Sequence, residues 1–225
     1  LYHSVDGAYA TFEEYLGKIK PAQTDKDGKT VVLYAAHKDG QHSYIEKAKS
    51  KGYDVLLLDS PIVGHLIQKL EGESENVSFS RVDSDLIDNL IKKDETRVSQ
   101  LSDKEKEALK GSLETAIPKA KFTVRLEDMD SSDAPFTITV PEFMRRMKEM
   151  SATGGGMFGM TDMPEMYDLV VNSNHPLSNK ILAEESADVK NTLINQALDL
   201  AKLQQNLLHG EELTKFIARS YETIA

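Results

Sequence analysis

Gly28, Lys29 and Thr30 form the first group of residues whose types and spacing could do chemistry. They resemble the end of a phosphate-binding loop, in which backbone amides and a lysine hold nucleotide phosphates. A phosphate-binding loop also requires a glycine five residues before Gly28, where this chain has Gln23. Such a loop follows a strand. Here the tripeptide ends a predicted turn at 21–30 and precedes an apolar run at 31–36, so no nucleotide site is expected.

Metal and nucleophile chemistry have equally weak support. His37 and His42 lie five residues apart without a third ligand near them in sequence. The chain has no Cys and no G-x-S-x-G motif, and His175 stands in an Asn-His-Pro turn that is more typical of a cap than of a base. Acidic residues between two predicted strands indicate a polar hairpin: Glu127, Asp128, Asp130 and Asp133. We therefore expect no catalytic residue, no metal and no cofactor, and keep a carboxylate-based enzyme as a minor alternative.

Binding chemistry is better supported, because seven of the eight Met residues lie between 144 and 166. Met is unbranched and polarizable, so a Met-rich surface can repack around different partners. The segment 141–150 is amphipathic, and its Met run continues past a triplet of glycines at 154–156, which disfavours helix. We expect a binding surface formed by Phe143, Met144, Met147, Met150, Met157, Phe158 and Met160. The alternative is one face of an ordinary core helix.

Composition excludes several other classes of protein. The 225 residues are 40% hydrophobic and 28% charged, which is typical of a globular chain with a sizeable core. A net charge of −10 without a basic stripe argues against nucleic-acid binding. No apolar run approaches 18 residues, so no membrane span is expected. The lack of Cys and of a secretion signal favours the cytoplasm, and a start without Met indicates a piece of a longer protein.

The first half alternates predicted strands with predicted helices. Apolar runs at 31–36 and 53–59 and an alternating run at 76–82 indicate strands, and helices are expected at 43–52 and 61–72. This order predicts a parallel α/β layer. Residues 83–104 are charged and weakly apolar, and we interpret them as a helical linker with a domain boundary near Thr96. The expected domains are 1–96 and 97–225.

The second half predicts an α+β domain with a small sheet followed by helices. A capping box at Ser102 and Glu105 begins a helix that ends near Ile117. Strands are expected at 121–127, 135–140 and 166–172, and two long helices at 188–208 and 211–224.

The last two helices are apolar on more than one side. On the first, one stripe contains Leu193, Ala197, Leu200 and Leu207, and a second stripe contains Ile194, Leu198, Ala201 and Leu208. A helix that is apolar on two sides must be covered on two sides. We expect a dimeric four-helix bundle with an interface formed by Leu193, Ala197, Leu200, Leu207, Leu213, Phe216, Ile217 and Tyr221. The alternative is packing on the chain's own sheet alone.

Several segments, in this order, resemble the heat-shock protein 90 chaperones. They are Glu13-Glu14-Tyr15, the helix ending at Gly52 with the strand Tyr53 to Leu58, Ser60-Pro61-Ile62, and Asn172 with His175-Pro176-Leu177. The order agrees across nearly the whole chain and is most similar to the bacterial form. One departure is Val63, where the family has an acidic residue.

The resemblance implies the end of a middle domain followed by a C-terminal dimerisation domain of an ATP-dependent chaperone. ATP and Mg²⁺ would belong to a domain before Leu1, so no ATPase activity is expected of this chain. The implied partners are a second copy of the chain and unfolded client proteins, which would bind the segment from Pro141 to Met163. An oligomerisation module without client binding is the alternative.

Overall fold

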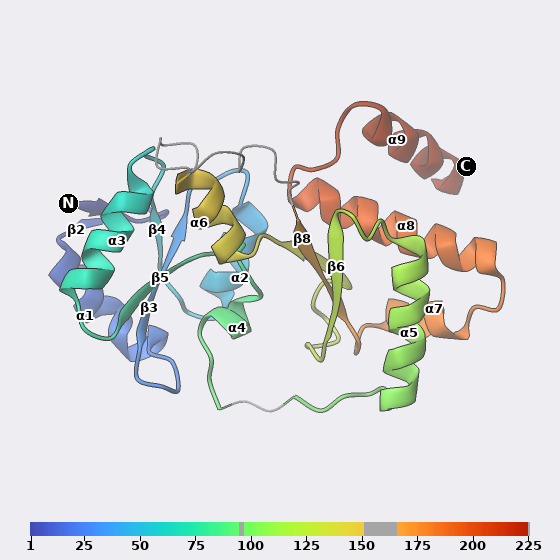
Figure 1. Ribbon diagram of the computed structural model, residues 1–225, viewed down its shortest axis with the longest axis horizontal. Coiled ribbons are helices and arrows are strands. Elements are labelled where there is room, and N and C mark those ends of the chain that lie inside the picture. The colour runs from blue at the N-terminus through green and yellow to red at the C-terminus, as the bar shows by residue number, and fades with distance from the viewer. Residues whose placement is uncertain (95–96, 151–165, 225) are drawn as a thin grey trace. The chain divides into compact units, whose positions relative to one another are not determined.

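A computed structural model describes residues 1–94, 97–150 and 166–224, with the side chains of 148–150, 223 and 224 left out. The chain divides into two compact units (Figure 1). The first contains Leu1–Glu95 and Val140–Pro164, and the second contains Thr96–Thr139 and Glu165–Ala225. The predicted boundary between residues 96 and 97 stays a prediction.

The first unit is an α/β layer, as expected. Its elements are β1 (Tyr2–His3), β2 (Tyr9–Ala10), α1 (Phe12–Gln23), β3 (Thr30–Ala35), α2 (His42–Ser50), β4 (Val55–Leu57), α3 (Val63–Glu73), β5 (Val77–Arg81), α4 (Ile87–Leu90) and α6 (Glu142–Met150). Strand β3 lies between β4 and β5 and pairs in parallel with both, which confirms the predicted parallel sheet.

The continuous apolar run of β3 reflects burial on both faces of this sheet. Val31, Leu33 and Ala35 pack with α2 and α4 on one face. Val32 and Tyr34 pack with α1 and α3 on the other (Figure 1). All six residues of β3 are buried, so the central strand of the sheet organises both halves of the core.

Two segments of the first unit differ from the prediction. Helix α1 continues to Gln23 through Pro21, where we expected a turn. Gln23 is buried, donates to the carbonyl of Val31 at 2.8 Å and accepts from the amide of Asp54 at 2.7 Å, so tertiary contacts hold the last turn in place. Residues 83–91 are core and not linker: the only turn of helix there is α4, and Ile87 and Ile91 are buried beside α2.

The second unit is a small mixed sheet covered by helices. Its elements are α5 (Asp103–Ala116), β6 (Phe122–Glu127), β7 (Phe136–Thr139), β8 (Tyr167–Asn172), α7 (Pro176–Ala183), α8 (Ala187–Gln204) and α9 (Gly210–Ile224). The predicted capping box is confirmed, because Ser102 and Glu105 bond to each other's backbone amides. Helix α5 contacts β6, and α8 contacts β7.

The predicted hairpin between β6 and β7 is wrong. Strand β8 lies between them, parallel to β6 and antiparallel to β7. Leu169, Val170 and Val171 of β8 are fully buried, so the most apolar strand takes the central position, where both of its edges are paired. The acidic segment after β6 is therefore a loop that connects the two edge strands.

The turn after β8 contains buried polar side chains that are hydrogen-bonded to the main chain. Asn172 accepts from the amide of Asn174 at 3.0 Å, and Asn174 donates to the carbonyls of Val98 and Met129. His175 is the N-cap of α7, with Nδ1 accepting from the amide of Leu177 at 3.0 Å, which confirms the predicted cap. The hydrogen bond from Asn174 to Val98 holds the segment that precedes α5 against this turn.

No helix within the described residues combines the length and apolarity needed to cross a lipid bilayer.

Candidate functional site

Helix α6 carries the described part of the predicted Met surface. It begins after Val140, whose amide donates to the carbonyl of Asp83 at 2.9 Å. Glu142 in its first turn favours helix because an acidic side chain there complements the positive end of the helix dipole. At about 100° per residue, Phe143 and Met147 lie on one side of the helix and Arg145 on the opposite side.

Arg145 inserts into the first unit. Its side chain is 7% exposed, and its Nη2 donates to the hydroxyl of Tyr34 at 2.5 Å. The guanidinium carbon lies 5.6 Å from the centre of the Tyr34 ring, and Glu142 forms an ion pair with the same group. A buried arginine requires such partners, because an unpaired buried charge is strongly destabilising.

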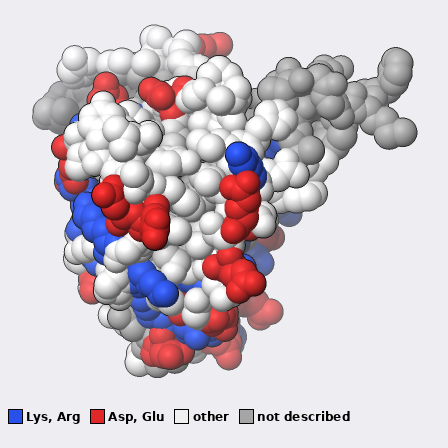
Figure 2. All heavy atoms as spheres, turned by 90° about the vertical axis from the view of Figure 1, so that its left-hand side faces the viewer, with Lys and Arg blue, Asp and Glu red and all other residues white. Residues whose placement is uncertain are grey.

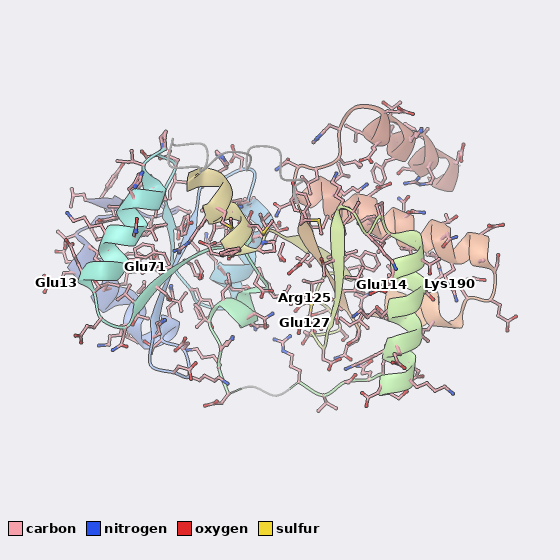
Figure 3. All side chains as sticks on the ribbon, in the orientation of Figure 1. Glu13, Glu71, Glu114, Arg125, Glu127 and Lys190 are labelled. Carbon is pink, nitrogen blue, oxygen red and sulfur yellow. The ribbon has the colours of Figure 1, made fainter. Side chains whose placement is uncertain are left out.

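Arg146 joins α6 to α3 and β5. Its guanidinium donates to the two carboxylate oxygens of Glu71 at 3.2 and 3.3 Å and to the carbonyl of Phe79 at 3.1 Å. Figure 3 labels Glu71 on α3. Burial lowers the pKa of Arg146, but hydrogen bonds and charge contacts with Glu71 and Glu142 outweigh burial and raise it. The side chain is therefore a permanent cation in this network.

The apolar side of α6 points away from these contacts. Phe143 is 71% exposed, and Met144 and Met147 are half-buried. Met150 ends the helix, but its side chain, like Met157, Phe158 and Met160, lies outside the described residues. The helix thus contacts the α/β layer through arginine and shows part of its apolar side to solvent.

Sequence reasoning missed the docking role of Arg145, Arg146, Glu71 and Tyr34. Charged residues on an amphipathic helix usually mark its solvated side. The available signal was Glu142, three and four residues before the two arginines, a spacing that lets one carboxylate pair with both.

Helices α8 and α9 carry the predicted interface residues except Leu207, which lies between them because α8 ends at Gln204 and not at residue 208 as predicted. Leu200, Ile217 and Tyr221 are 53%, 45% and 70% exposed, and Ala197 is buried within its own unit. The remaining predicted residues are half-buried: Leu193, Leu207, Leu213 and Phe216. The side chains of the second stripe are buried within the chain: Ile194, Leu198, Ala201 and Leu208.

The weak catalytic motifs have structural roles where they are described. Gly28 has a φ of 82° in a turn in which Asp25 accepts from the amides of Asp27 and Lys29, and Thr30 begins β3. Within the described residues, no three His, Asp or Glu side chains are grouped so that they could hold a metal ion. The face of the molecule in Figure 2 intersperses Lys and Arg with Asp and Glu.

Comparisons with known proteins match the chain from end to end. It is 34% identical to the chaperone protein HtpG of Bacteroides fragilis over 291 residues, with 100% of this chain and 43% of the relative covered. HtpG of Bacteroides thetaiotaomicron is 35% identical with the same coverage. HtpG of Porphyromonas gingivalis is 40% identical over 207 residues, with 91% of this chain and 30% of the relative covered. No family model matches the chain.

These relatives place the chain in a class, the heat-shock protein 90 chaperones. Within that class, the chain belongs to the HtpG family and spans less than half the length of these curated relatives.

Proposed function

We propose that this chain binds unfolded or partly folded proteins through the outward side of α6 and pairs with a second copy of itself through α8 and α9. The observation that carries the client-binding proposal is the orientation of α6. A helix docked by its arginines, with Phe143 71% exposed, supports a role for its apolar side in contacts with other proteins. The chaperone name of the homologous proteins supports the same role.

The dimer proposal rests on spacing and exposure along α8. Apolar side chains that alternate at four and three residues form the seam of helix pairs. This spacing runs, with one polar member, through Val189, Leu193, Gln196, Leu200 and Leu203 of α8. Val189, Leu200 and Leu203 are exposed in the single chain, so a partner helix has apolar surface to cover. Burial of such side chains is worth roughly 1.5–3 kcal/mol each before association entropy is subtracted.

We propose a binding role and no catalysis for this chain itself. ATP-driven steps of a complete chaperone would lie in other parts of the protein. A phosphate-release assay on the isolated chain checks this, and ATP hydrolysis by the chain alone would contradict it.

The test is a pair of substitutions on the outward side of α6. Phe143→Ser and Met147→Ser together remove apolar contact area without touching either arginine. We expect the Kd for fluorescently labelled, reduced and carboxymethylated α-lactalbumin to rise about tenfold or more, equivalent to about 1.4 kcal/mol. Fluorescence anisotropy measures it.

Ile62→Ser is the matched control, because Ile62 is 64% exposed in the same unit and lies just before α3. It is expected to leave the affinity unchanged. Equal affinity of the double variant and wild type would discard the client-binding role of α6 and favour the alternative, an oligomerisation module without client binding.

A further inference from the structure

Strand β5 is an edge of its sheet, and side chains of the described residues cover the centre of that edge. In a parallel pair, alternate residues direct their peptide groups to opposite sides. Asn76 accepts from the amide of Thr30 and Val82 donates to the carbonyl of Tyr34, so these residues face β3. The peptide groups of Val77, Phe79 and Arg81 therefore point outward. Such outward groups are a template for another strand unless something covers them.

Two side chains cover the centre of this edge. Glu71 Oε1 accepts from the amide of Phe79 at 2.8 Å, and Arg146 Nη2 donates to its carbonyl at 3.1 Å. Because Glu71 and Arg146 are also ion-paired, together they present the acceptor and the donor that a neighbouring strand would present. On the opposite edge of the sheet, which is β4, the main chain itself covers the strand, since the amide of Val5 donates to the carbonyl of Val55 at 2.9 Å.

Arg146 belongs to α6, which is held in part by charge, whereas Glu71 belongs to α3. Within residues 142–147, whose side chains the structure describes, Arg145 is buried and the others are half-buried or exposed. Phe143 stays largely in water while Met144 and Met147 are partly covered, so the polar contacts of Arg145 and Arg146 add to apolar contacts in holding α6. Partly exposed ion pairs of this kind open more readily than an apolar core.

We infer that Arg146 is a positioning residue whose pair with Glu71 holds the apolar side of α6 outward and closes the β5 edge against an extended polypeptide. The role of the outward side rests on the proposed function, whereas closure of the edge does not. When α6 is released, the carbonyl of Phe79 loses its donor, and Glu71 on α3, which holds the amide of Phe79, loses its ion-pair partner. The ligand that the amide and the carbonyl of Phe79 fit is a polypeptide segment in extended conformation, which adds to the sheet as a strand.

The experiment is hydrogen–deuterium exchange with residue resolution on the full chain. Arg146→Gln and Glu71→Gln each remove one charge of the pair. We expect each variant to exchange the Phe79 amide and the amides of α6 about tenfold faster than wild type. The double variant is expected to be no faster than the single variants, because non-additivity identifies residues that act through each other.

Lys69→Gln is the matched control. Lys69 forms an ion pair with Glu73 at 3.8 Å on the same helix α3, with both side chains more than half exposed. It is expected to leave the exchange of Phe79 and α6 unchanged.

The extended ligand is tested by adding reduced and carboxymethylated α-lactalbumin to the Arg146→Gln variant. The unfolded probe is expected to slow exchange at Phe79 again by about threefold or more, because strand addition protects an edge amide. Unchanged exchange in the single variants, additive effects in the double variant, or no protection by the probe would each overturn the inference. Amide exchange measured without the probe does not involve client binding. A failure of the Arg146–Glu71 pair to close the β5 edge can therefore be distinguished from a failure of the proposed function.

Discussion

Asp128 shows how single contacts set the ionisation of a side chain in the second unit. Its carboxylate accepts from Lys106 Nζ at 2.8 Å and from the hydroxyl of Ser173. Burial raises the pKa of Asp128, but hydrogen bonds from Lys106, Ser173 and Ser99 and the charge of Lys106 outweigh burial, and the pKa is lowered. The charged carboxylate is therefore favoured in the folded state.

This lowered pKa predicts a stability that depends on pH. A carboxylate with a lower pKa in the folded state stabilises the protein above its unfolded pKa, and this contribution is lost as the pH falls through the folded pKa. Asp128→Asn is thus expected to lower the free energy of unfolding at pH 7 by about 1 kcal/mol. The difference from wild type should shrink toward zero below about pH 3. Urea unfolding across this range measures both values.

Glu185→Gln is the control for that series, because Glu185 is an exposed carboxylate of the same unit. It is expected to change little at either pH. A loss of stability in Asp128→Asn that does not vary with pH would show that the asparagine is misfitted and that ionisation plays no part.

At the scale of elements, the docking of α6 depends on one tyrosine of the central strand. Tyr34 is 1% exposed, and its hydroxyl accepts from Arg145. Tyr34→Phe leaves a buried guanidinium with one acceptor fewer, which costs about 1–2 kcal/mol. We expect faster amide exchange in α6 and a lower free energy of unfolding for the first unit.

Tyr9→Phe is the matched control, since Tyr9 is 66% exposed in the same unit. It should not affect exchange in α6. If the two tyrosine variants behave alike, Arg145 does not dock α6 through Tyr34.

The regular elements could be predicted because their signals are local. The continuous apolar run of β3 indicates that the strand is buried on both faces. The capping box of Ser102 and Glu105 indicates where α5 begins. The turn His175-Pro176 likewise carries its own cap. In each case neighbouring residues suffice to choose the conformation.

What the sequence could not show depends on contacts between distant residues. The insertion of β8 between β6 and β7 is a choice of sheet order, which no local pattern encodes. Gln23 keeps α1 helical through contacts with Val31 and Asp54. For α6, periodicity separates the arginine side from the Met side but does not say which of the two is docked. Identifying the arginine side required the positions of Glu71 and Tyr34.

At the scale of the whole molecule, the two proposed surfaces lie in separate units. The outward side of α6 belongs to the first unit, and the exposed side of α8 and α9 belongs to the second. Pairing of chains can therefore be disrupted without changing the residues around α6, and the two roles can be tested separately.

Leu200→Glu is the substitution that tests pairing. Leu200 is 53% exposed near the middle of the proposed seam, and a charge there would have to be buried without a partner. We expect the Kd of the pair to rise at least about 100-fold, equivalent to about 2.7 kcal/mol, while stability of the single chain changes little. Light scattering over a dilution series measures it, with wild type expected at twice 25.1 kDa.

Asn195→Glu is the control for Leu200→Glu, because Asn195 is an exposed residue of α8 about 120° away from the seam. It places the same charge on the same helix and is expected to keep the doubled mass. A wild-type chain that stays at 25.1 kDa at every concentration would reject the dimer. The exposed side of α8 would then need a different partner, because an apolar seam of this length is unfavourable in water.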